Sequence, residues 1–288
     1  MIRQSNVGVV YNPWASRSGE LVEKFSEKLG LDESSWIVEA SSTDFKDPDP
    51  DTSLIITIGG DGTILWANQI AAPRNIPILG VNLGRVGFLT ELSADKAIDS
   101  IGPYLDGSAR VEERAMLQAT ISGGESQNFS DERFQALNDV VVGRSAISRL
   151  VHLEVKIDDA ILTTYRADAV IVATATGSTG YSISAGGPIL SPESRNILIN
   201  PLATHLAMDN PLVVPPDSCV EIALKSDYDA VFSLDGRPDL DLLPGQVVKI
   251  VQSEYTAKFL RLSPANQFYS LLTNRLNPET TYKTSDSK

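Results

Sequence analysis

The sequence contains one cysteine and two histidines among 288 residues, and this scarcity excludes several kinds of site. A single thiol, Cys219, cannot form an intramolecular disulfide framework or a zinc site built from several cysteines. His152 and His205 are too few and too isolated in the sequence for a metal cluster, so core or surface roles are expected for both. Neither a disulfide-stapled fold nor a histidine-rich metal centre is therefore expected.

Long apolar runs are also missing. None approaches the roughly 18 residues that a membrane-spanning helix needs. Residues 1–13 contain one arginine and lack the long apolar segment of a secretory signal. We therefore expect a soluble, cytoplasmic protein with no membrane partner.

Positive charge is scarce, because 24 lysines and arginines stand against 37 aspartates and glutamates, a formal net charge of −13. Without a broad positive field, nucleic acid and anionic membrane surfaces are not expected partners. A local site can still bind a small anion. The content of 42% hydrophobic and 21% charged residues excludes global disorder. At roughly 150 residues per domain, the length indicates two domains.

Strand-like and helix-like segments alternate in residues 1–106. Strands are expected at 7–11, 36–39, 54–58 and 76–81, and helices at 18–29, 64–71 and 94–105. The continuous apolar strand at 54–58 is of the kind that is buried on both faces of a parallel sheet. The alternation predicts an α/β domain with right-handed crossovers.

The sequence becomes β-rich in residues 107–263. Short strands separated by turn residues are expected at 116–122, 136–142, 151–157, 169–173, 211–214, 220–223, 230–234 and 247–251. A helical pattern follows at 267–276 within the C-terminal segment 264–288. The predicted fold class is thus α/β plus β: a parallel-sheet domain followed by a β-rich, sandwich-like domain.

The sharpest motif is GGDGT at residues 59–63, between the strand at 54–58 and the helix at 64–71. Ligands of open α/β sheets bind at this edge. Glycines let the backbone approach an anion, and amides at a helix start point at phosphate oxygens. Asp61 would repel phosphate, so its presence indicates a further role, either accepting a proton from an attacking hydroxyl or holding a cation. The alternative is a tight turn in which Asp61 caps the helix.

A second glycine-rich turn, NLGRVGFL at residues 82–89, follows the strand at 76–81. It is not a GxGxxG fingerprint, because Asn82 stands where the first glycine would fall. Arg85 is a candidate phosphate partner. An ordinary strand-to-helix loop is the alternative.

Asn138 and Asp139 head the apolar run 140–142. An amide beside a carboxylate offers hydrogen-bond donors and acceptors together, which suits ribose hydroxyls or an adenine edge. The alternative is a simple turn.

The segment at 169–188, AVIVATATGSTGYSISAGGP, runs from a buried-type strand into small hydroxyl and glycine residues. These side chains can hydrogen-bond a sugar or phosphate with little bulk, and Tyr181 is a candidate to stack on a base. Thr176 replaces the first glycine of a hydrolase GxSxG elbow. A Walker A Gly-Lys-Ser/Thr and a kinase His-Arg-Asp are missing. A surface connection is the alternative.

In this order the motifs resemble those of the NAD kinase family. Its succession is GGDGT, NxGxxGFL, Asn-Asp or Asn-Glu before a β run, a TPTGSTAYSLSAGGP block, and Asp-Gly-Gln/Arg, here at residues 235–237. GGDGT alone is shared with diacylglycerol and sphingosine kinases, whereas GSTGYSISAGGP is far more specific. The resemblance covers nearly the whole chain, from about Val7 to Leu276.

The resemblance implies an N-terminal α/β domain that carries GGDGT, a β-rich domain that holds much of the NAD site, and a C-terminal segment that returns to the first domain. It implies phosphorylation of the adenosine 2′-hydroxyl of NAD by ATP, or by polyphosphate in some members, with a divalent cation such as Mg²⁺. It also implies a homodimer or homotetramer whose NAD sites are completed across subunits.

By the same resemblance, Asp61 is the general base and contacts NAD together with Gly62. The other NAD-binding positions that it implies are Asn138, Asp139, Arg149, Arg166, Asp168, Thr179, Gly180, Tyr181, Ser182, Ser184, Ala203 and Arg237. We expect ATP phosphates at the two glycine-rich turns, at Gly59, Gly60, Gly62, Thr63, Asn82, Gly84, Arg85 and Gly87. No metal ligand is indicated.

The sequence departs from the family pattern at a few positions. Ala175 and Gly180 replace the usual Pro and Ala, and the second Pro is missing before His205. These changes leave the polar groups in place. A lipid kinase of the diacylglycerol or sphingosine type is the alternative function, opposed by the acidic balance. An NAD-binding sensor without turnover is a third, opposed by the intact Asp61.

Overall fold

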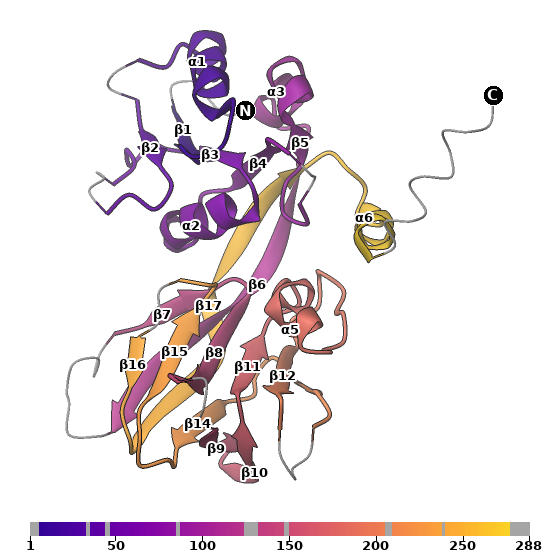
Figure 1. The fold of residues 1–288 in the computed structure, drawn as a ribbon. Helices are drawn as coiled ribbons and strands as arrows, with labels where there is room; N and C mark the ends of the chain where they lie inside the picture. The colour runs from indigo at the N-terminus through magenta and orange to yellow at the C-terminus, as the bar shows by residue number, and fades with distance from the viewer. Residues whose placement is uncertain are drawn as a thin grey trace. The chain divides into compact units, whose positions relative to one another are not determined.

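A computed structural model describes residues 6–32, 35–43, 47–84, 87–123, 132–146, 150–204, 209–237 and 240–276 (Figure 1). The chain divides into two compact units, one of residues 1–112 and 258–288, the other of residues 113–257. Within the described ranges, no helix is both long enough and apolar enough to span a membrane.

The first unit is built on a parallel sheet in the order β2-β1-β3-β4. The short β5 pairs with β4 in parallel, and so does the end of β17, where Phe259 lies opposite Ile78. The bounds are β1 (Val7–Tyr11), β2 (Ile37–Glu39), β3 (Leu54–Gly59), β4 (Ile78–Asn82), β5 (Leu92–Ser93) and β17 (Gln246–Arg261). Every residue of β3 and β4 is buried, as the apolar composition predicts.

Helices cover both faces of this sheet. Figure 1 shows α1 and α3 on one side and α2 on the other. Leu21, Phe25 and Leu29 of α1 are buried against alternate residues of β1 and β3 because they recur at helical spacing. The bounds are α1 (Ser18–Leu29), α2 (Asp61–Ala71), the 3₁₀ helix η2 (Ala72–Arg74), α3 (Ala94–Ser100), α4 (Gly102–Leu105) and α6 (Gln267–Leu276).

Two expected helices differ in detail. The helix predicted at 64–71 begins three residues earlier, at Asp61. The single helix predicted at 94–105 is wrong: α3 ends at Ser100, and α4 starts afresh at Gly102. Pro103 lies in the first turn of α4. Proline lacks the N–H that would continue the preceding helix, but it fits a first turn.

The second unit is a pair of antiparallel layers. One is a six-stranded sheet in the order β13-β12-β11-β8-β15-β16. The other contains β10-β9-β14-β17, and β6 pairs with both β17 and β7. The bounds are β6 (Arg110–Gly123), β7 (Phe134–Ala136), β8 (Asp139–Arg144), β9 (Val151–Ile157), β10 (Ala160–Ala167), β11 (Ala169–Ala173), β12 (Ile197–Leu202), β13 (Leu212–Val214), β14 (Val220–Leu224), β15 (Ala230–Leu234) and β16 (Leu240–Leu242), with the short helices η3 (Gly177–Thr179) and α5 (Tyr181–Ser184).

The core of this unit lies between the layers. Alternate residues of each strand contribute to it, such as Val140 and Val142 of β8 and Leu153 and Val155 of β9. The outer face of the six-stranded sheet is partly covered as well, where Ile171 and other apolar residues form a small second core. The sandwich-like domain predicted from the sequence is confirmed.

The hydropathy pattern does not predict β10, β12 or β16. It also predicts one strand at 136–142, where the structure has β7 and β8. The break falls at Leu137 and Asn138, whose amides hydrogen-bond to the carboxylate of Asp235 instead of to a neighbouring strand. A side chain distant in sequence thus decides the local structure.

Candidate active site

The GGDGT turn lies where β3 ends and α2 begins. Gly59 is the last residue of β3, and Gly60 is the N-cap of α2. A β-carbon on Gly59 would lie 2.2 Å from the hydroxyl oxygen of Thr63, so only glycine fits there. The alternative that Asp61 caps the helix is wrong, because Asp61 is already the first helical residue. The first-turn amides of an α-helix have no partner within the helix, which suits them to bind an anion.

The carboxylate of Asp61 is held by the second glycine-rich turn. Its Oδ2 accepts a hydrogen bond from the amide of Phe88 at 3.2 Å, and its Oδ1 accepts one from Leu89 at 3.3 Å. The side chain is 29% exposed, so it also faces solvent. A carboxylate held in this way can accept a proton from a hydroxyl placed beside it.

Asn82 organises the second turn. Its side-chain oxygen accepts a hydrogen bond from the amide of Gly84 at 2.6 Å, and its side-chain nitrogen donates to the hydroxyl of Thr90 at 3.4 Å. The amide of Gly87 donates to the same hydroxyl at 2.9 Å. Gly59 and Asn82 lie opposite each other in the sheet, so both turns leave the same edge. Arg85 lies outside the described residues.

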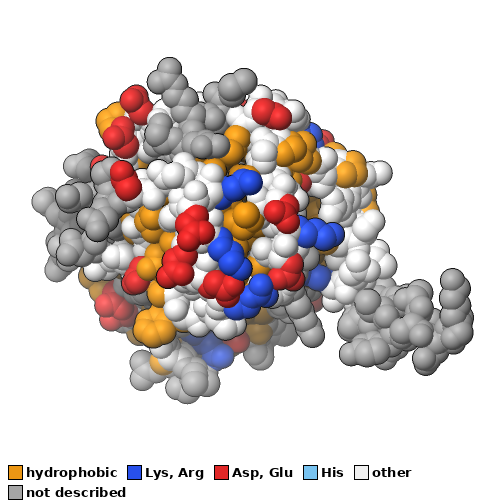
Figure 2. Space-filling view, turned by 90° about the horizontal axis from the view of Figure 1, so that it is seen from above, with side chains coloured by type: hydrophobic (Ala, Val, Ile, Leu, Met, Phe, Trp, Pro, Cys, Tyr) orange, Lys and Arg blue, Asp and Glu red, His pale blue; other side chains and the backbone are white. Residues whose placement is uncertain are grey.

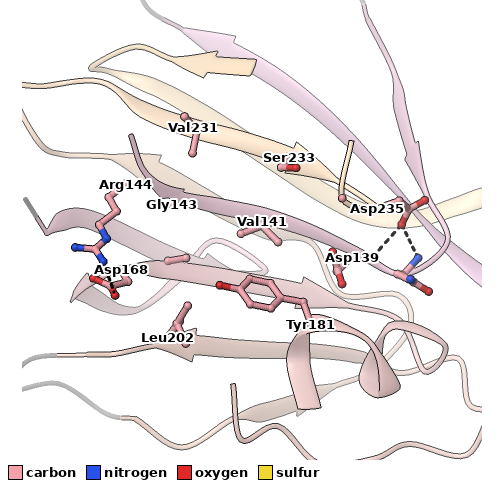
Figure 3. A pocket seen from close by; sticks show the side chains of 13 residues that line it. Asp139, Val141, Gly143, Arg144, Asp168, Tyr181, Leu202, Val231, Ser233 and Asp235 are labelled. Atoms are coloured by element: carbon pink, nitrogen blue, oxygen red, sulfur yellow. Dashed lines mark hydrogen bonds and ion pairs between the residues drawn. The ribbon is translucent and has the colours of Figure 1, made fainter. Parts of the chain in front are cut away.

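The second unit contains a cavity of about 540 Å³ on the outer face of its six-stranded sheet. Its volume is in the range of small-molecule sites. The residues that line it are Asn138, Asp139, Val141, Gly143, Arg144, Asp168, Ala169, Tyr181, Leu202, Val231, Ser233, Asp235 and Gly236. Figure 3 shows Arg144 and Asp168 at one end, Asp139 and Asp235 at the other, and Tyr181 between them.

Strand register produces this cavity. Gly143 of β8 lies opposite Ala169 of β11 and Val231 of β15, and these three residues form part of its floor. Side chains of a strand alternate between faces, so Val140 and Val142 enter the core while Val141 and Gly143 line the cavity. The small residues Gly143 and Ala169 leave the floor hollow.

Asp235 builds one end of the cavity. Its partly buried carboxylate accepts hydrogen bonds from the amides of Leu137, Asn138 and Asp139 at 2.9, 2.7 and 3.2 Å. Asp235 and Gly236 both have positive φ, as in a tight hairpin turn, so the 233–237 segment is a turn and also lines the cavity. Burial raises the pKa of Asp235, and the three amides act in the opposite direction.

Asp139 lies beside Asp235 and titrates near neutral pH. Burial, together with the neighbouring charge of Asp235, raises the pKa of Asp139 to about 7. At neutral pH the carboxyl is therefore protonated in a large fraction of molecules. It can then donate a hydrogen bond as well as accept one.

The opposite end carries an ion pair that sequence reasoning missed. Nη2 of Arg144 lies 3.1 Å from Oδ2 of Asp168, and both side chains are partly buried. Asp168 was expected in the site, but Arg144 was not. Alternation along β8 gives no signal for Arg144, because it predicts the same face as Val140 and Val142, which point into the core.

The segment after β11 is folded tightly against the Asn138 turn. The hydroxyl of Thr174 donates to the carbonyl of Leu137 at 2.6 Å and accepts the amide of Gly177 at 3.1 Å. A β-carbon on Gly177 would lie 2.0 Å from the carbonyl oxygen of Asn138. The hydroxyls of this segment therefore serve partly to fix the turn rather than to meet a ligand.

The predicted residues of this segment divide into two groups. Tyr181 lines the cavity, and a β-carbon on Gly180 would come within 3.8 Å of the Asp139 carboxylate. Ser182 is fully buried, and its hydroxyl accepts a hydrogen bond from Asn200 at 3.2 Å. Thr179 donates to the carbonyl of Thr176 at 3.0 Å. Ser184 is exposed at the end of α5.

Three other predicted positions, all among the described residues, do not line the cavity. Arg166 is an exposed residue of β10, and Ala203 follows β12 with a positive φ of 50°. The guanidinium of Arg237 is turned to backbone, since Nη2 donates to the carbonyl of Gln135 at 2.7 Å. Burial lowers the pKa of Arg237. Arg149 lies outside the described residues, as does His205.

The first unit has a smaller hollow, of about 350 Å³, between α1 and α3. Arginine, lysine, aspartate and glutamate all line it, and the exposed pair Arg17–Asp95 closes at 2.9 Å. The face seen from above likewise carries acidic and basic side chains next to one another (Figure 2). Within the described ranges, no three His, Cys, Asp or Glu residues group as a metal site would require.

Two family models match the chain. The ATP-NAD kinase N-terminal domain matches residues 14–109, and the ATP-NAD kinase C-terminal domain matches residues 137–262. Residues 263–288 lie outside both matches. Between them the two models cover most of the chain.

Curated relatives are similar over nearly their whole length. A protein named NAD kinase from Dehalococcoides mccartyi is 39% identical over 280 residues, with 96% of this chain and 98% of the relative covered. An NAD kinase from Chloroflexus aurantiacus is also 39% identical over 280 residues, with 94% and 98% covered.

Two solved structures share the fold. The yeast NADH kinase complexed with NADH superimposes with a TM-score of 0.77 at 25% identity, covering 99% of this chain and 90% of that one. An NAD kinase from Archaeoglobus fulgidus in complex with ATP gives a TM-score of 0.72 at 26% identity, covering 93% and 98%.

Proposed function

From the premise that this chain belongs to the NAD kinase family, we propose that Asp61 is the general base of phosphoryl transfer to NAD. The chain is an NAD kinase, an enzyme with NAD and ATP as substrates. The acceptor is the 2′-hydroxyl of the adenosine ribose, and Asp61 accepts its proton as the phosphoryl group moves. A lipid kinase is not supported, since the family matches and the relatives are NAD kinases.

The observation that carries this proposal is the support of the Asp61 carboxylate. Both of its oxygens accept backbone amides of the Phe88–Leu89 turn, and the side chain remains partly exposed. Phosphoryl transfer needs little covalent chemistry from the protein; it needs alignment of the reacting groups and neutralisation of phosphate charge. A carboxylate held in place serves the alignment and provides the base. A positioned base contributes on the order of 10²–10⁴-fold to the rate.

We infer that the donor phosphates bind at the edge where the two glycine-rich turns meet. The space beside Gly60 and Gly62 at the start of α2 is open, since a β-carbon on either would meet nothing within 4 Å. Gly59, Thr63, Asn82, Gly84 and Gly87 form the rest of this edge in our proposal. The structure of the relative from Archaeoglobus fulgidus with ATP supports ATP as donor. Polyphosphate remains an alternative donor to be tested.

We infer that the 540 Å³ cavity of the second unit binds NAD. Its ends offer two kinds of polar group: a carboxyl that is protonated in part at neutral pH, Asp139, and the ion pair of Arg144 with Asp168. Tyr181 is 46% exposed and lines the same cavity, which suits stacking on a planar ring. Seven further contacts with NAD stay predictions, those by Arg149, Arg166, Thr179, Ser182, Ser184, Ala203 and Arg237.

A divalent cation fits this chain as an ion that arrives with the donor. Mg²⁺ is usually held by one or two carboxylates together with substrate phosphates. Asp61 is a carboxylate at the proposed phosphate edge, whereas the described residues offer no group of three ligands. When bound, the ion neutralises phosphate charge; the chain itself supplies the base and the amides.

Three wider inferences accompany this function. We propose that residues 1–106 with 264–288 act as the donor-binding domain and residues 107–263 as the NAD-binding domain. We propose that the enzyme works in the cytoplasm. We propose a homodimer or homotetramer, which sedimentation equilibrium of the purified chain would measure.

The test is the formation of NADP by the pure protein. NAD and NADH are each offered with ATP or polyphosphate, and the product, NADP from NAD or NADPH from NADH, is measured with a coupled dehydrogenase. Asp61→Asn keeps the shape of the side chain but not its basicity, so it should bind NAD nearly normally and lose at least about 99% of kcat. Asp95→Asn, a change at a 75% exposed side chain of the same unit, is the matched control. Wild-type kcat in Asp61→Asn would refute the assignment.

A further inference from the structure

The C-terminal helix brings a positive charge to Asp61. Near the end of α6, Nη2 of Arg275 lies 4.0 Å from Oδ2 of Asp61. The same carboxylate oxygen accepts the amide of Phe88, and Cζ of Arg275 lies 4.4 Å from the centre of the Phe88 ring. Three segments that are far apart in the sequence therefore meet at one carboxylate.

Aromatic packing orients this guanidinium. Arg275 lies over the ring of Phe88, and the ring of Phe268, from the first turn of α6, packs on Phe88 with centroids 5.9 Å apart. A guanidinium group is attracted to the face of an aromatic ring. Stacking on the ring also fixes the plane in which its N–H donors point. The helix is thus docked through the residue that also holds Asp61, so the position of Arg275 depends on the same turn.

Arg275 and Asp61 are close to each other but do not form a tight ion pair. At 4.0 Å the contact is longer than a hydrogen-bonded ion pair, so the two groups face each other without a bidentate grip. Arg275 is 41% exposed and Asp61 29% exposed, which leaves both accessible to a ligand. An anion that enters beside Asp61 is therefore within reach of the guanidinium.

The reaction needs a positively charged group close to Asp61. If Asp61 accepts the hydroxyl proton, the phosphoryl group must lie within a few ångströms of a carboxylate that repels it. Two like charges this close repel each other strongly where water screens them only in part. Among the described residues, Arg275 is the cation that forms an ion pair with Asp61.

We propose that Arg275 binds the transferring phosphoryl group and is a catalytic residue of the kinase reaction. This inference rests on the assignment of Asp61 as the base. The ribose oxygen forms its bond to the terminal phosphorus while the bond from that phosphorus to the bridging oxygen breaks. The electron pair leaves with ADP, and the hydroxyl proton goes to Asp61. Arg275 stays protonated and stabilises the charge on the phosphoryl oxygens. Without donor, it rests beside Asp61.

The experiment compares Arg275→Gln, Arg275→Lys and the wild-type full chain in the NADP assay. Loss of a group that stabilises transition-state charge typically lowers kcat by roughly 10²–10³-fold. We expect Arg275→Gln to lose about a hundredfold in kcat with the KM for NAD changed less than about threefold, and Arg275→Lys to lie between. Asn274→Ala, an exposed position on the same helical turn, is the matched control. Added guanidinium ion should restore part of the activity of Arg275→Ala.

Phe268→Ala separates chemistry from anchoring, because it weakens the docking of α6 while it keeps the guanidinium. Wild-type kcat in Arg275→Gln would overturn the proposal. So would an equal fall of kcat and thermal stability in Arg275→Gln and Phe268→Ala, since Arg275 would then only anchor the helix. If Asp61→Asn is inactive while Arg275→Gln is fully active, this inference fails and the proposed function stands. If Asp61→Asn is active, the base assignment fails first.

Discussion

A β-carbon on Gly87 would lie 1.9 Å from Oδ1 of Asp61. The glycine of the second turn is therefore required by the carboxylate of the first, and not by a left-handed backbone. The two glycine-rich turns therefore fit together. The missing side chain of Gly87 leaves space for the charged side chain of Asp61.

Gly87→Ala should displace either the Asp61 carboxylate or the turn that holds it. Because a misplacement of about 1 Å at a reacting group can lower a rate roughly a hundredfold, we expect a fall of that size in kcat. Gly19→Ala is the control, since its β-carbon would meet nothing within 4 Å in the exposed part of α1. Steady-state kinetics and thermal unfolding of both variants measure the effect. Full activity of Gly87→Ala would contradict the described geometry.

Asp235→Ala should destabilise the second unit. The substitution leaves three backbone amides of residues 137–139 without their acceptor. Each orphaned buried donor costs about 1–3 kcal/mol, less what water recovers, so we expect a loss of roughly 2–4 kcal/mol in urea unfolding. Asp235→Asn should lose nearly as much, because its NH₂ group would face an amide donor.

The control for Asp235 is Asp241→Ala, at an exposed position of β16. Its effect on stability should stay within about 0.5 kcal/mol.

The KM for NAD should also rise in Asp235→Ala, since the residue shapes one end of the cavity. Unchanged stability would show that the three amides find other partners.

The raised pKa of Asp139 predicts a pH dependence of stability. In the folded chain the group keeps its proton up to about pH 7, whereas in the unfolded chain it loses it near pH 3.8. The stability that this group contributes is therefore fully present below about pH 4 and is lost as pH rises through about 7. Asp235, whose pKa is also raised, contributes in the same direction.

Asp139→Asn removes this titration. Relative to the wild type, the variant should gain stability between about pH 4 and pH 8, by at most roughly 4 kcal/mol. Urea unfolding of both proteins at a series of pH values measures the difference. A difference that is constant over this range, or that changes in favour of the wild type, would contradict a raised pKa.

Glu91→Gln should weaken the packing of residues 261–263, at the end of β17, against the rest of the first unit. Glu91 forms a buried ion pair with Arg261 at 3.3 Å, and it accepts the amides of Leu262 and Ser263, both at 2.9 Å. Burial raises the pKa of Glu91, but the hydrogen bonds from Ser263 and the charge of Arg261 outweigh it, so the pKa is lowered. Breaking a buried pair of this kind costs roughly 3–5 kcal/mol.

The sign of the pH effect is opposite to that of Asp139. Because the folded pKa of Glu91 is lowered, its contribution is present above its unfolded pKa and lost as pH falls through the folded value. The stability gap between wild type and Glu91→Gln should therefore shrink in acid. Glu20→Gln, which removes an exposed helical ion pair with Lys24, should change little. A gap that widens in acid would reject this account.

Local segments of the sequence determined the chemistry. GGDGT follows a strand with no polar residue on either face except Thr57, and the glycines and first-turn amides there depend only on neighbours in the chain. The sequence also predicts the parallel α/β sheet, the sandwich-like unit and the family. These predictions rest on the period of the hydropathy pattern and on short motifs, which are properties of contiguous residues.

Only the tertiary structure decided which distant residues meet. The pairing of Arg144 with Asp168 depends on the register of β8 with β11, and the contact of Arg275 with Asp61 depends on the docking of α6. The division of the expected strand at 136–142 by Asp235 depends on a hairpin about a hundred residues later. A single sequence carries no direct signal for such pairings, because they are selected by the packing of whole elements rather than by propensity along the chain.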